Sequence, residues 1–158
     1  MVTGDELREA MRRFAPGIAV VTLNAGGLRL GITVASLVSL SLEPPLVGVS
    51  VGTSSSAHEP LREAGQFVVN LLAGDQERVA QHFARSGVPP IALWSGISLR
   101  ESPQSEPQLE GALAWITCRT RDELDAGDHT IFVGEVLSLE LGRPGAALVY
   151  VGGGYRSV

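Results

Sequence analysis

The apolar residues of this chain occur mostly in short runs of strand length, and helical spacing is confined to a few stretches. The first of these is an N-terminal pattern at i, i+3, i+4 and i+7, formed by Leu7, Ala10, Met11 and Phe14. With charged residues between the apolar ones, this spacing predicts an amphipathic helix of about three turns. Thr3 and Glu6 are placed to form a capping box at its start, and Pro16-Gly17 is expected to end it.

The short apolar runs predict strands that are joined mainly as hairpins. A β-branched run at 18–23, the turn signal at 24–27 and the segment Leu28–Val38 make the first predicted hairpin. Further strands are expected at Leu46–Val51, Phe67–Leu72, Ala112–Leu124, Thr130–Leu141 and Ala147–Val151, with short helices near Ala57–Ala64 and Asp75–Arg85. This order favours a mainly β fold with helices, built as an antiparallel barrel rather than a doubly wound parallel sheet. No repeat or linker divides the chain, so we expect a single domain over residues 1–158.

Two segments have no regular period. Residues 86–110 contain four prolines, and a loop of this length in a compact domain is typically a functional lid, an interface arm or a mobile segment. The Gly-rich tail that begins at Gly152 contains Tyr155, which is either an anchor or simply disordered.

Charge and composition exclude several classes of partner. Twelve Lys and Arg residues are dispersed through a chain of net charge −5, which argues against nucleic acid as the main partner. No segment approaches the roughly 18 consecutive apolar residues of a membrane span, and the N-terminus has no signal-peptide pattern. We therefore expect a soluble, cytoplasmic protein. The single cysteine, Cys118, lies in an apolar run and is expected to be a buried structural thiol.

Common catalytic signatures do not occur in this sequence. His58, His82 and His129 share no metal-ligand spacing, so no metal site is expected. There is also no GxSxG elbow, no GxxxxGK[ST] loop and no GxGxxG fingerprint after a strand. Neither an ATPase nor a Rossmann-type enzyme is therefore indicated.

Two neighbouring segments rich in small hydroxyl residues are the most informative. In the loop Thr53–Ser56, Ser56 is spaced from Glu59 for a capping box, but the same hydroxyls at a helix N-terminus also suit a phosphate group. The segment Thr33–Ser41 alternates small residues with Val and Leu, as an ordinary half-exposed strand does. It also suits a flavin ring, which needs a close approach to the backbone along one edge. From the residues alone, each segment can be either an ordinary structural element or part of a ligand site, and both interpretations stay open.

Two aromatic or titratable residues outside these segments are also candidates. His129 opens a strand after an acidic turn, where local hydrogen bonding is the ordinary explanation, although histidine is the side chain whose reference pKa lies nearest neutrality. Phe83 is by default a core residue of its helix.

Taken together, these residues resemble the flavin reductase family, small FMN-binding split-barrel proteins that often serve as the reductase component of two-component monooxygenases. The resemblance rests on four segments that occur in order: AMRRFAPGIAVVT at 10–22, GITVASLVSLSLEPPLVGVSV at 31–51, SSSAHEPLREAGQFVVNLLAGDQERVAQHFA at 54–84 and LEGALAWITCRTRDELDAGDHTIFVGEV at 109–136. It implies an antiparallel split β-barrel of the FMN-binding type and a homodimer with flavin near the subunit interface. It also implies an NAD(P)H:flavin oxidoreductase that uses FMN or FAD with NADH or NADPH, with a flavin-dependent monooxygenase as a possible partner.

The resemblance further implies roles for individual residues. The isoalloxazine and ribityl chain would be lined by Thr33, Val34, Ala35, Ser36 and Leu37, and the ribityl chain and phosphate would be contacted by Ser50, Val51, Ser54, Ser55 and Ser56. Phe83 would come from the helix that closes this end of the site. His129 would be the catalytic residue, near flavin and nicotinamide, and would orient the nicotinamide amide or stabilise developing charge. Tyr155 would shape the nicotinamide side.

Other classes of protein remain possible at this point. One is a non-catalytic flavin- or heme-binding split barrel, which would be yellow on purification but would not bleach with NADH or NADPH. Another is a split-barrel oxidase or a deazaflavin-dependent reductase, which shares the barrel but needs a different ligand pocket. A common fold does not separate these functions.

Overall fold

The computed structural model describes residues 1–158 and contains nine strands and four helices. The strands are β1 (Ala19–Ala25), β2 (Leu28–Val34), β3 (Val38–Leu42), β4 (Pro45–Gly52), β5 (Gln66–Leu71), β6 (Ala114–Ala126), β7 (His129–Leu141), β8 (Leu148–Val151) and β9 (Gly154–Ser157). The helices are α1 (Gly4–Met11), α2 (His58–Ala64), α3 (Glu77–Ala84) and α4 (Pro90–Leu93). No helix is long and apolar enough to cross a membrane. The predicted strands are confirmed with small shifts at their ends, except that the expected strand Leu28–Val38 stops at Val34 and the chain then turns into β3.

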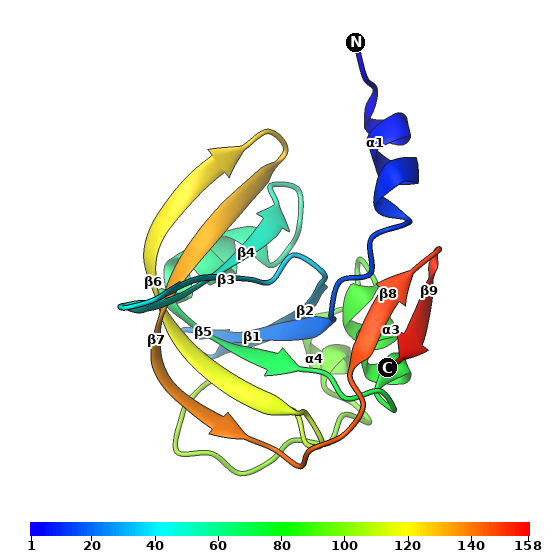
Figure 1. Ribbon diagram of the computed structural model, residues 1–158. Helices are drawn as coiled ribbons and strands as arrows, with labels where there is room; N and C mark the ends of the chain where they lie inside the picture. Colours follow the sequence, from blue (N-terminus) through cyan, green and yellow to red (C-terminus); the bar gives the residue numbers. More distant parts are fainter.

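Seven strands form one antiparallel sheet that curls into a split barrel. Their order is β2-β1-β5-β6-β7-β4-β3, and β8 pairs separately with β9. Figure 1 shows the sheet wrapping round so that β2 approaches β4. There the Ser36 hydroxyl donates to the carbonyl oxygen of Ser50 (3.1 Å) and accepts from its backbone N–H (3.0 Å). These two bonds from the Ser36 side chain link the chain after β2 to β4, where no strand pairing joins β2 and β4 directly. The predicted fold class, an antiparallel split β-barrel, is confirmed.

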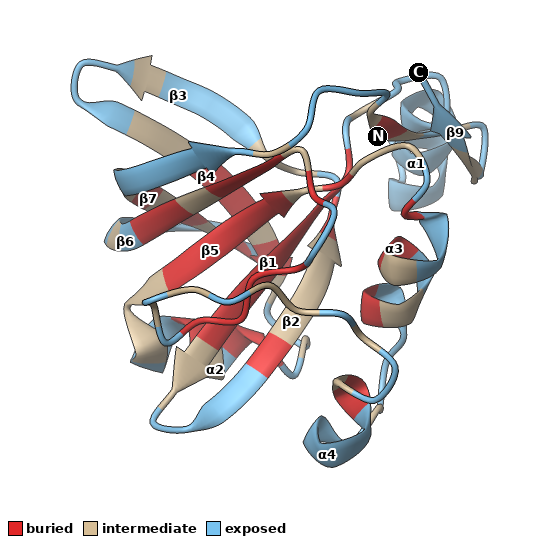
Figure 2. Cartoon of the chain, turned by 90° about the horizontal axis from the view of Figure 1, so that it is seen from below, coloured by how far each residue is buried: buried red, intermediate tan, exposed pale blue.

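The hydrophobic core lies inside the curled sheet. Figure 2 shows buried residues concentrated along β1 and β5, and Phe67 and Phe132 are both completely buried. Gly134 on β7 allows the close approach of these layers, because a Cβ there would lie 2.8 Å from both the Phe67 ring and the Cβ of Cys118. Cys118 is free and buried, and burial raises the pKa of its thiol to about 12. The predicted structural thiol is therefore confirmed.

The helix α3 packs closely against β2, and two residues of β2 fix this contact. A Cβ at Gly31 would lie 2.8 Å from the ring of Phe83, so only glycine leaves room for that ring. Two residues further along, the Thr33 hydroxyl donates to the carbonyl oxygen of Ala80 (2.7 Å). The sequence of β2 thus determines where the end of α3 and the Phe83 side chain lie.

The long segment between α3 and β6 is docked on the sheet over its last part. Residues 106–109 are buried. The Thr22 hydroxyl donates to the carbonyl oxygen of Pro107, and the Asn70 side-chain oxygen accepts from the backbone N–H of Leu109 (2.9 Å). Since Thr22 and Asn70 are themselves buried on β1 and β5, this part of the segment contributes to the core and does not form a detached lid.

The two ends of the chain differ from their predicted structures. The capping box of α1 is confirmed, because the Glu6 N–H donates to the Thr3 hydroxyl (3.2 Å) and the Thr3 N–H donates to the Glu6 carboxylate (2.8 Å). The helix nevertheless ends well before Pro16, buries none of its residues and extends away from the sheet (Figure 1). At the other end, the two alternatives for the tail are an anchor through Tyr155 and a disordered segment, and the disordered alternative is wrong, since β9 pairs with β8 and places Tyr155 opposite Tyr150.

Candidate functional site

One hollow in the surface brings together predicted site residues from three separate parts of the chain. Its volume is about 480 Å³, and the predicted residues that line it are Ser54, Ser55, Ser56, Phe83 and His129. Gly31, Gly52 and Arg85 are further members of its lining, and no carboxylate is among them. We refer to this site as the serine hollow. Residues that are far apart in the sequence thus meet where the resemblance places one ligand.

The pairing of β4 with β7 builds the serine hollow. In this register Gly52 lies opposite His129. The next residue, Thr53, donates to the carbonyl oxygen of Asp128 from its backbone N–H (2.9 Å) and from its hydroxyl (3.2 Å). The loop after β4 is therefore held against the β6–β7 turn, and its three serines come to lie beside His129.

Of the two open interpretations of this loop, the capping box between Ser56 and Glu59 is wrong. The N-cap residue of α2 is Ala57, and no side chain caps the helix. Ser55 instead accepts a hydrogen bond from the Ala57 N–H (3.2 Å), and Glu59 makes an ion pair within α2. A turn in the loop shifts the start of the helix by one residue, so Ser56 falls outside the capping position. The hydroxyls of Ser54 and Ser56 make no side-chain hydrogen bond within the chain and remain available to a ligand.

The imidazole of His129 is held by its neighbour Asp128. The distance between His129 Nδ1 and Asp128 Oδ1 is 2.7 Å. Because a carboxylate only accepts hydrogen bonds, Nδ1 carries the proton and Nε2 is left with a free lone pair in the neutral ring. This hydrogen bond and the attraction of the imidazolium lower the pKa of Asp128 below its ordinary value. Nε2 lies toward Gly52, in the lining of the hollow. The hydrogen bond to Asp128 uses Nδ1, so Nε2 remains free to accept a hydrogen bond from a ligand.

The end of α3 supplies an apolar wall and a positive charge. Phe83 is only 3% exposed and packs against Trp94, with the ring centroids 5.3 Å apart. Arg85 follows directly after the helix and makes no ion pair, and it was not a candidate from the sequence. The only local signal for it was a basic residue next to the apolar face of a predicted helix.

The donor set of the serine hollow fits a phosphate group. Hydroxyls from Ser54 and Ser56 and the guanidinium of Arg85 are all hydrogen-bond donors, and no carboxylate opposes them. Arginine is the side chain best matched to the geometry of phosphate oxygens. The residues present therefore suit the phosphate end of a flavin.

The five residues predicted to line the flavin ring lie on β2 and its continuation, and they are not equivalent. The side chain of Val34 is in the core at 5% exposure, and so is that of Val51 on β4 at 1%. Ligand contacts at these two positions are thus confined to the backbone. The hydroxyls of Thr33 and Ser36 bond to α3 and to Ser50, as described above. These bonds hold the strand in place, and the hydroxyl oxygens keep acceptor capacity.

The remaining ring residues line a different depression, the N-terminal groove, with a volume of about 790 Å³. Its lining combines Ala35, Ser36 and Leu37 with Met11 and Phe14 near the end of the first helix. Because β2 also contributes Gly31 and Ile32 to the serine hollow, one continuous stretch of chain runs from the serine hollow to the groove.

Tyr155 lies in neither depression. It packs edge-to-face on Tyr150, with the ring centroids 5.0 Å apart. Partial burial raises the pKa of Tyr155, and the nearby Tyr150 and Glu77 raise it further. Within one chain, the structure therefore does not bring Tyr155 together with His129 in a single pocket.

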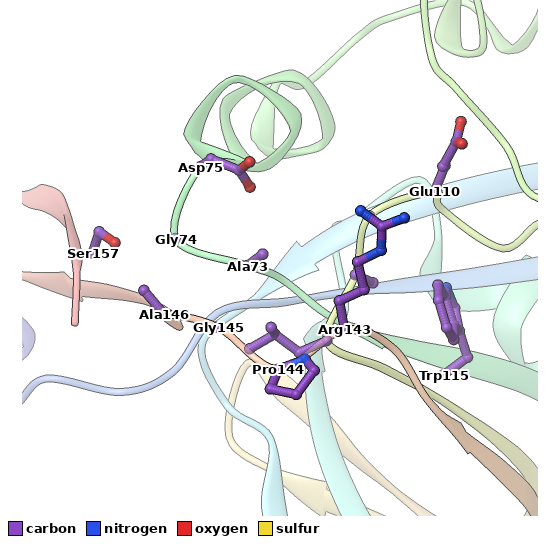
Figure 3. Close-up of a pocket in the computed structure, with 13 residues that line it drawn as sticks. Ala73, Gly74, Asp75, Glu110, Trp115, Arg143, Pro144, Gly145, Ala146 and Ser157 are labelled. Carbon is purple, nitrogen blue, oxygen red and sulfur yellow. The ribbon is translucent and has the colours of Figure 1, made fainter.

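A third depression contains none of the predicted site residues. Its volume is about 680 Å³, and the side chains of Asp75, Glu110 and Arg143 come from three segments around it (Figure 3). Both signs of charge are present, so its donor set is not specific for an anion. No group of three or more His, Cys, Asp or Glu side chains is arranged to hold a metal ion.

Comparison with known proteins identifies the family. A family model described as flavin reductase like domain matches residues 11–158. The reductase component of 4-hydroxyphenylacetate 3-monooxygenase from Thermus thermophilus is 41% identical over 152 residues, which cover 96% of this chain and 95% of that protein. The FMN reductase (NADH) SmoA of Agrobacterium fabrum is 37% identical over 148 residues, covering 94% and 82%. The crystal structure of BorF, the flavin reductase component of a bacterial two-component tryptophan halogenase, matches with a TM-score of 0.87 at 38% identity, covering 99% of this chain and 98% of BorF. The chain belongs to the flavin reductase family, as the resemblance implied.

Proposed function

We propose that this chain is an NADH-dependent flavin reductase that transfers a hydride from the nicotinamide to FMN or FAD. The observation that carries the proposal is the serine hollow, where hydroxyls, a guanidinium and an oriented histidine converge without an opposing carboxylate. Two relatives support it, since one is named as an FMN reductase (NADH) and the other as the reductase component of a monooxygenase. The chemistry that the two bound molecules supply is hydride transfer from the nicotinamide ring to the flavin ring.

The residues of the serine hollow divide into binding and orienting groups. Ser54, Ser56 and Arg85 hold the flavin phosphate, and Phe83 forms the apolar wall beside it. His129 is fixed by Asp128 with its Nε2 free, so it can accept a hydrogen bond from the carboxamide of the nicotinamide. Holding the two rings in a reactive orientation is a large contribution that the protein can make to such a reaction.

The flavin ring and ribityl chain lie along the stretch from Thr33 to Leu37 in this proposal. Ser50 and Val51 contact the ribityl chain from β4, where Val51 offers only its backbone. Tyr155 shapes the nicotinamide side, and since it does not line the serine hollow of its own chain, we assign this role to the Tyr155 of a second copy.

The experiment that tests the activity mixes the protein with FMN or FAD and with NADH or NADPH, and follows the absorbance of the reduced nicotinamide. Loss of absorbance in at least one mixture is expected. A yellow protein that leaves the nicotinamide unoxidised in all four mixtures would instead be a non-catalytic flavin-binding module.

We also propose a homodimer. The first helix carries an amphipathic sequence but buries no residue, and Leu7, Met11 and Phe14 are 58%, 51% and 57% exposed. Met11 and Phe14 line the N-terminal groove, most of whose lining residues are hydrophobic, and a second copy that covers the helix and the groove removes this surface from water. Sedimentation equilibrium is expected to give twice the chain mass for the wild type and a lighter species for Phe14→Glu. A wild type that sediments as a monomer at micromolar concentration would contradict the dimer.

The same relatives suggest which partner protein receives the reduced flavin. We propose that residues 1–158 act as one domain in the cytoplasm and deliver reduced flavin to a separate flavin-dependent monooxygenase. The names of the Thermus thermophilus relative and of BorF support such a two-component arrangement.

A further inference from the structure

A basic depression adjoins the serine hollow and shares Arg85 with it. Its volume is about 610 Å³, and its lining includes Arg78 and His82 from α3, Arg85 directly after the helix, and the segment Ser95–Ile97. We refer to it as the arginine hollow. Since Arg85 also lines the serine hollow, the two depressions meet at this side chain.

The arginine hollow carries an uncompensated positive charge. Neither Arg78 nor Arg85 makes an ion pair, and no Asp or Glu lines the hollow. Glu77, the carboxylate next to Arg78 in the sequence, accepts a hydrogen bond from Gln81 instead (3.3 Å). The whole chain has a net charge of −5, so this concentration of free arginines is not a general property of its surface.

Helix stability does not explain this arrangement. A basic residue near the C-terminus of a helix is favoured by the helix dipole, which accounts for Arg85. Arg78, however, lies in the first turn of α3, where the dipole disfavours a cation. Arg78 and His82 are spaced at i and i+4, so they lie on one face of α3, and Arg85, directly after the helix, lines the same hollow.

His82 contacts one of the two guanidinium groups. Its Nε2 lies 2.5 Å from the carbonyl oxygen of Leu93, which can only accept, so Nε2 carries the proton. In the neutral ring Nδ1 is then an acceptor, and Arg85 approaches it at 3.5 Å. This long contact lies in the arginine hollow, on the side where Arg85 also lines the serine hollow.

We propose that the arginine hollow binds the adenylate half of FAD, so that the enzyme binds FAD more tightly than FMN. This inference rests on the proposed function. FAD is FMN extended by adenosine monophosphate through a second phosphate. A ligand whose first phosphate lies in the serine hollow beside Arg85 therefore carries its second phosphate next to it, toward Arg78. The apolar side chains of Val79 and Ile97 line the same hollow and provide a surface for the adenine.

The test compares FAD and FMN binding, measured by quenching of flavin fluorescence, which needs no turnover. In Arg78→Gln the Kd for FAD is expected to rise about tenfold, the effect of losing one charge-assisted hydrogen bond. The Kd for FMN is expected to change by less than about twofold. In Arg85→Gln both flavins bind more weakly, because Arg85 faces both hollows. The matched control is Arg121→Gln, which removes an exposed charge from β6 and leaves both constants unchanged.

Three outcomes overturn the proposal. One is an unchanged ratio of FAD to FMN affinity in Arg78→Gln. Another is a loss of FMN affinity as large as the loss of FAD affinity in that variant. The third is an Arg78→Gln variant in which the KM for NADPH rises while the Kd values for both flavins stay unchanged, which assigns the hollow to the 2′-phosphate of NADPH. In each case wild-type oxidation of NADH with FMN still tests the proposed function separately.

Discussion

The close contact between β2 and α3 makes Gly31→Ala the most informative single substitution. The new Cβ would lie 2.8 Å and 2.9 Å from two carbons of the Phe83 ring and 3.5 Å from the Thr22 methyl group. The ring cannot easily move away, because it is 3% exposed and packs against Trp94 and His82. Overpacking of this kind costs about 1–3 kcal/mol. For a domain of this size that cost lowers Tm by about 2–4 °C for each kcal/mol.

The assay is urea and thermal unfolding of the wild type, Gly31→Ala and two further variants. In the double variant Gly31→Ala/Phe83→Leu the smaller side chain at 83 relieves the contact, so its loss of stability is expected to be at least about 1 kcal/mol less than the sum of the two single losses. The control is Gly145→Ala, where no atom lies within 4 Å of the added Cβ and φ is not positive. It is expected to stay within about 0.5 kcal/mol of the wild type. Additive single losses would refute the packing account of Gly31.

Three further predictions concern the site and the core. His129→Ala is expected to lower kcat/KM for NADH by about tenfold, and a value within about twofold of the wild type excludes the orienting role. Ser56→Ala is expected to weaken FMN binding by about threefold to tenfold while riboflavin, which lacks the phosphate, binds as before; equal losses for both ligands contradict a phosphate contact. The raised pKa of Cys118 keeps its thiol protonated in the fold, so the stability it contributes is present below pH 9.0 and is lost as pH rises toward about 12. Native protein is expected to resist thiol labelling at pH 8.5, and rapid labelling without denaturant would oppose this.

Local patterns in the sequence were sufficient for most elements of the barrel. β-branched runs and turn signals located the strands, since each depends on nearby residues. The same kind of local signal was right for only one of the two candidate capping boxes. Thr3 and Glu6 form the predicted box, whereas Ser56 and Glu59, at the same spacing, do not. The difference comes from a turn after Gly52 that is held by the distant residue Asp128, and no local pattern contains that contact.

Burial was harder to predict than secondary structure, because it depends on partners far away in the chain. The segment that ends in Leu109 has no periodic pattern, yet it is buried through bonds to Thr22 and Asn70. Arg85 lines the serine hollow because α3 packs against β2, and this contact between distant segments has no signal in the local sequence. The resemblance to a family supplied the serines, Phe83 and His129, and the structure places these in one hollow while Ala35, Ser36 and Leu37 line another.

The isolation of α1 has a consequence for how this protein behaves on dilution. The helix has only 8 residues, and helices shorter than about 12–15 residues are marginal in water unless other parts of a protein stabilise them. Its capping box adds only about 1 kcal/mol. In the proposed dimer, contacts with the partner subunit therefore stabilise α1, and the fraction of α1 that is helical depends on how much of the protein is dimeric. The helical circular dichroism signal should decrease as the protein is diluted through the dissociation constant, while the signal from the barrel strands stays constant.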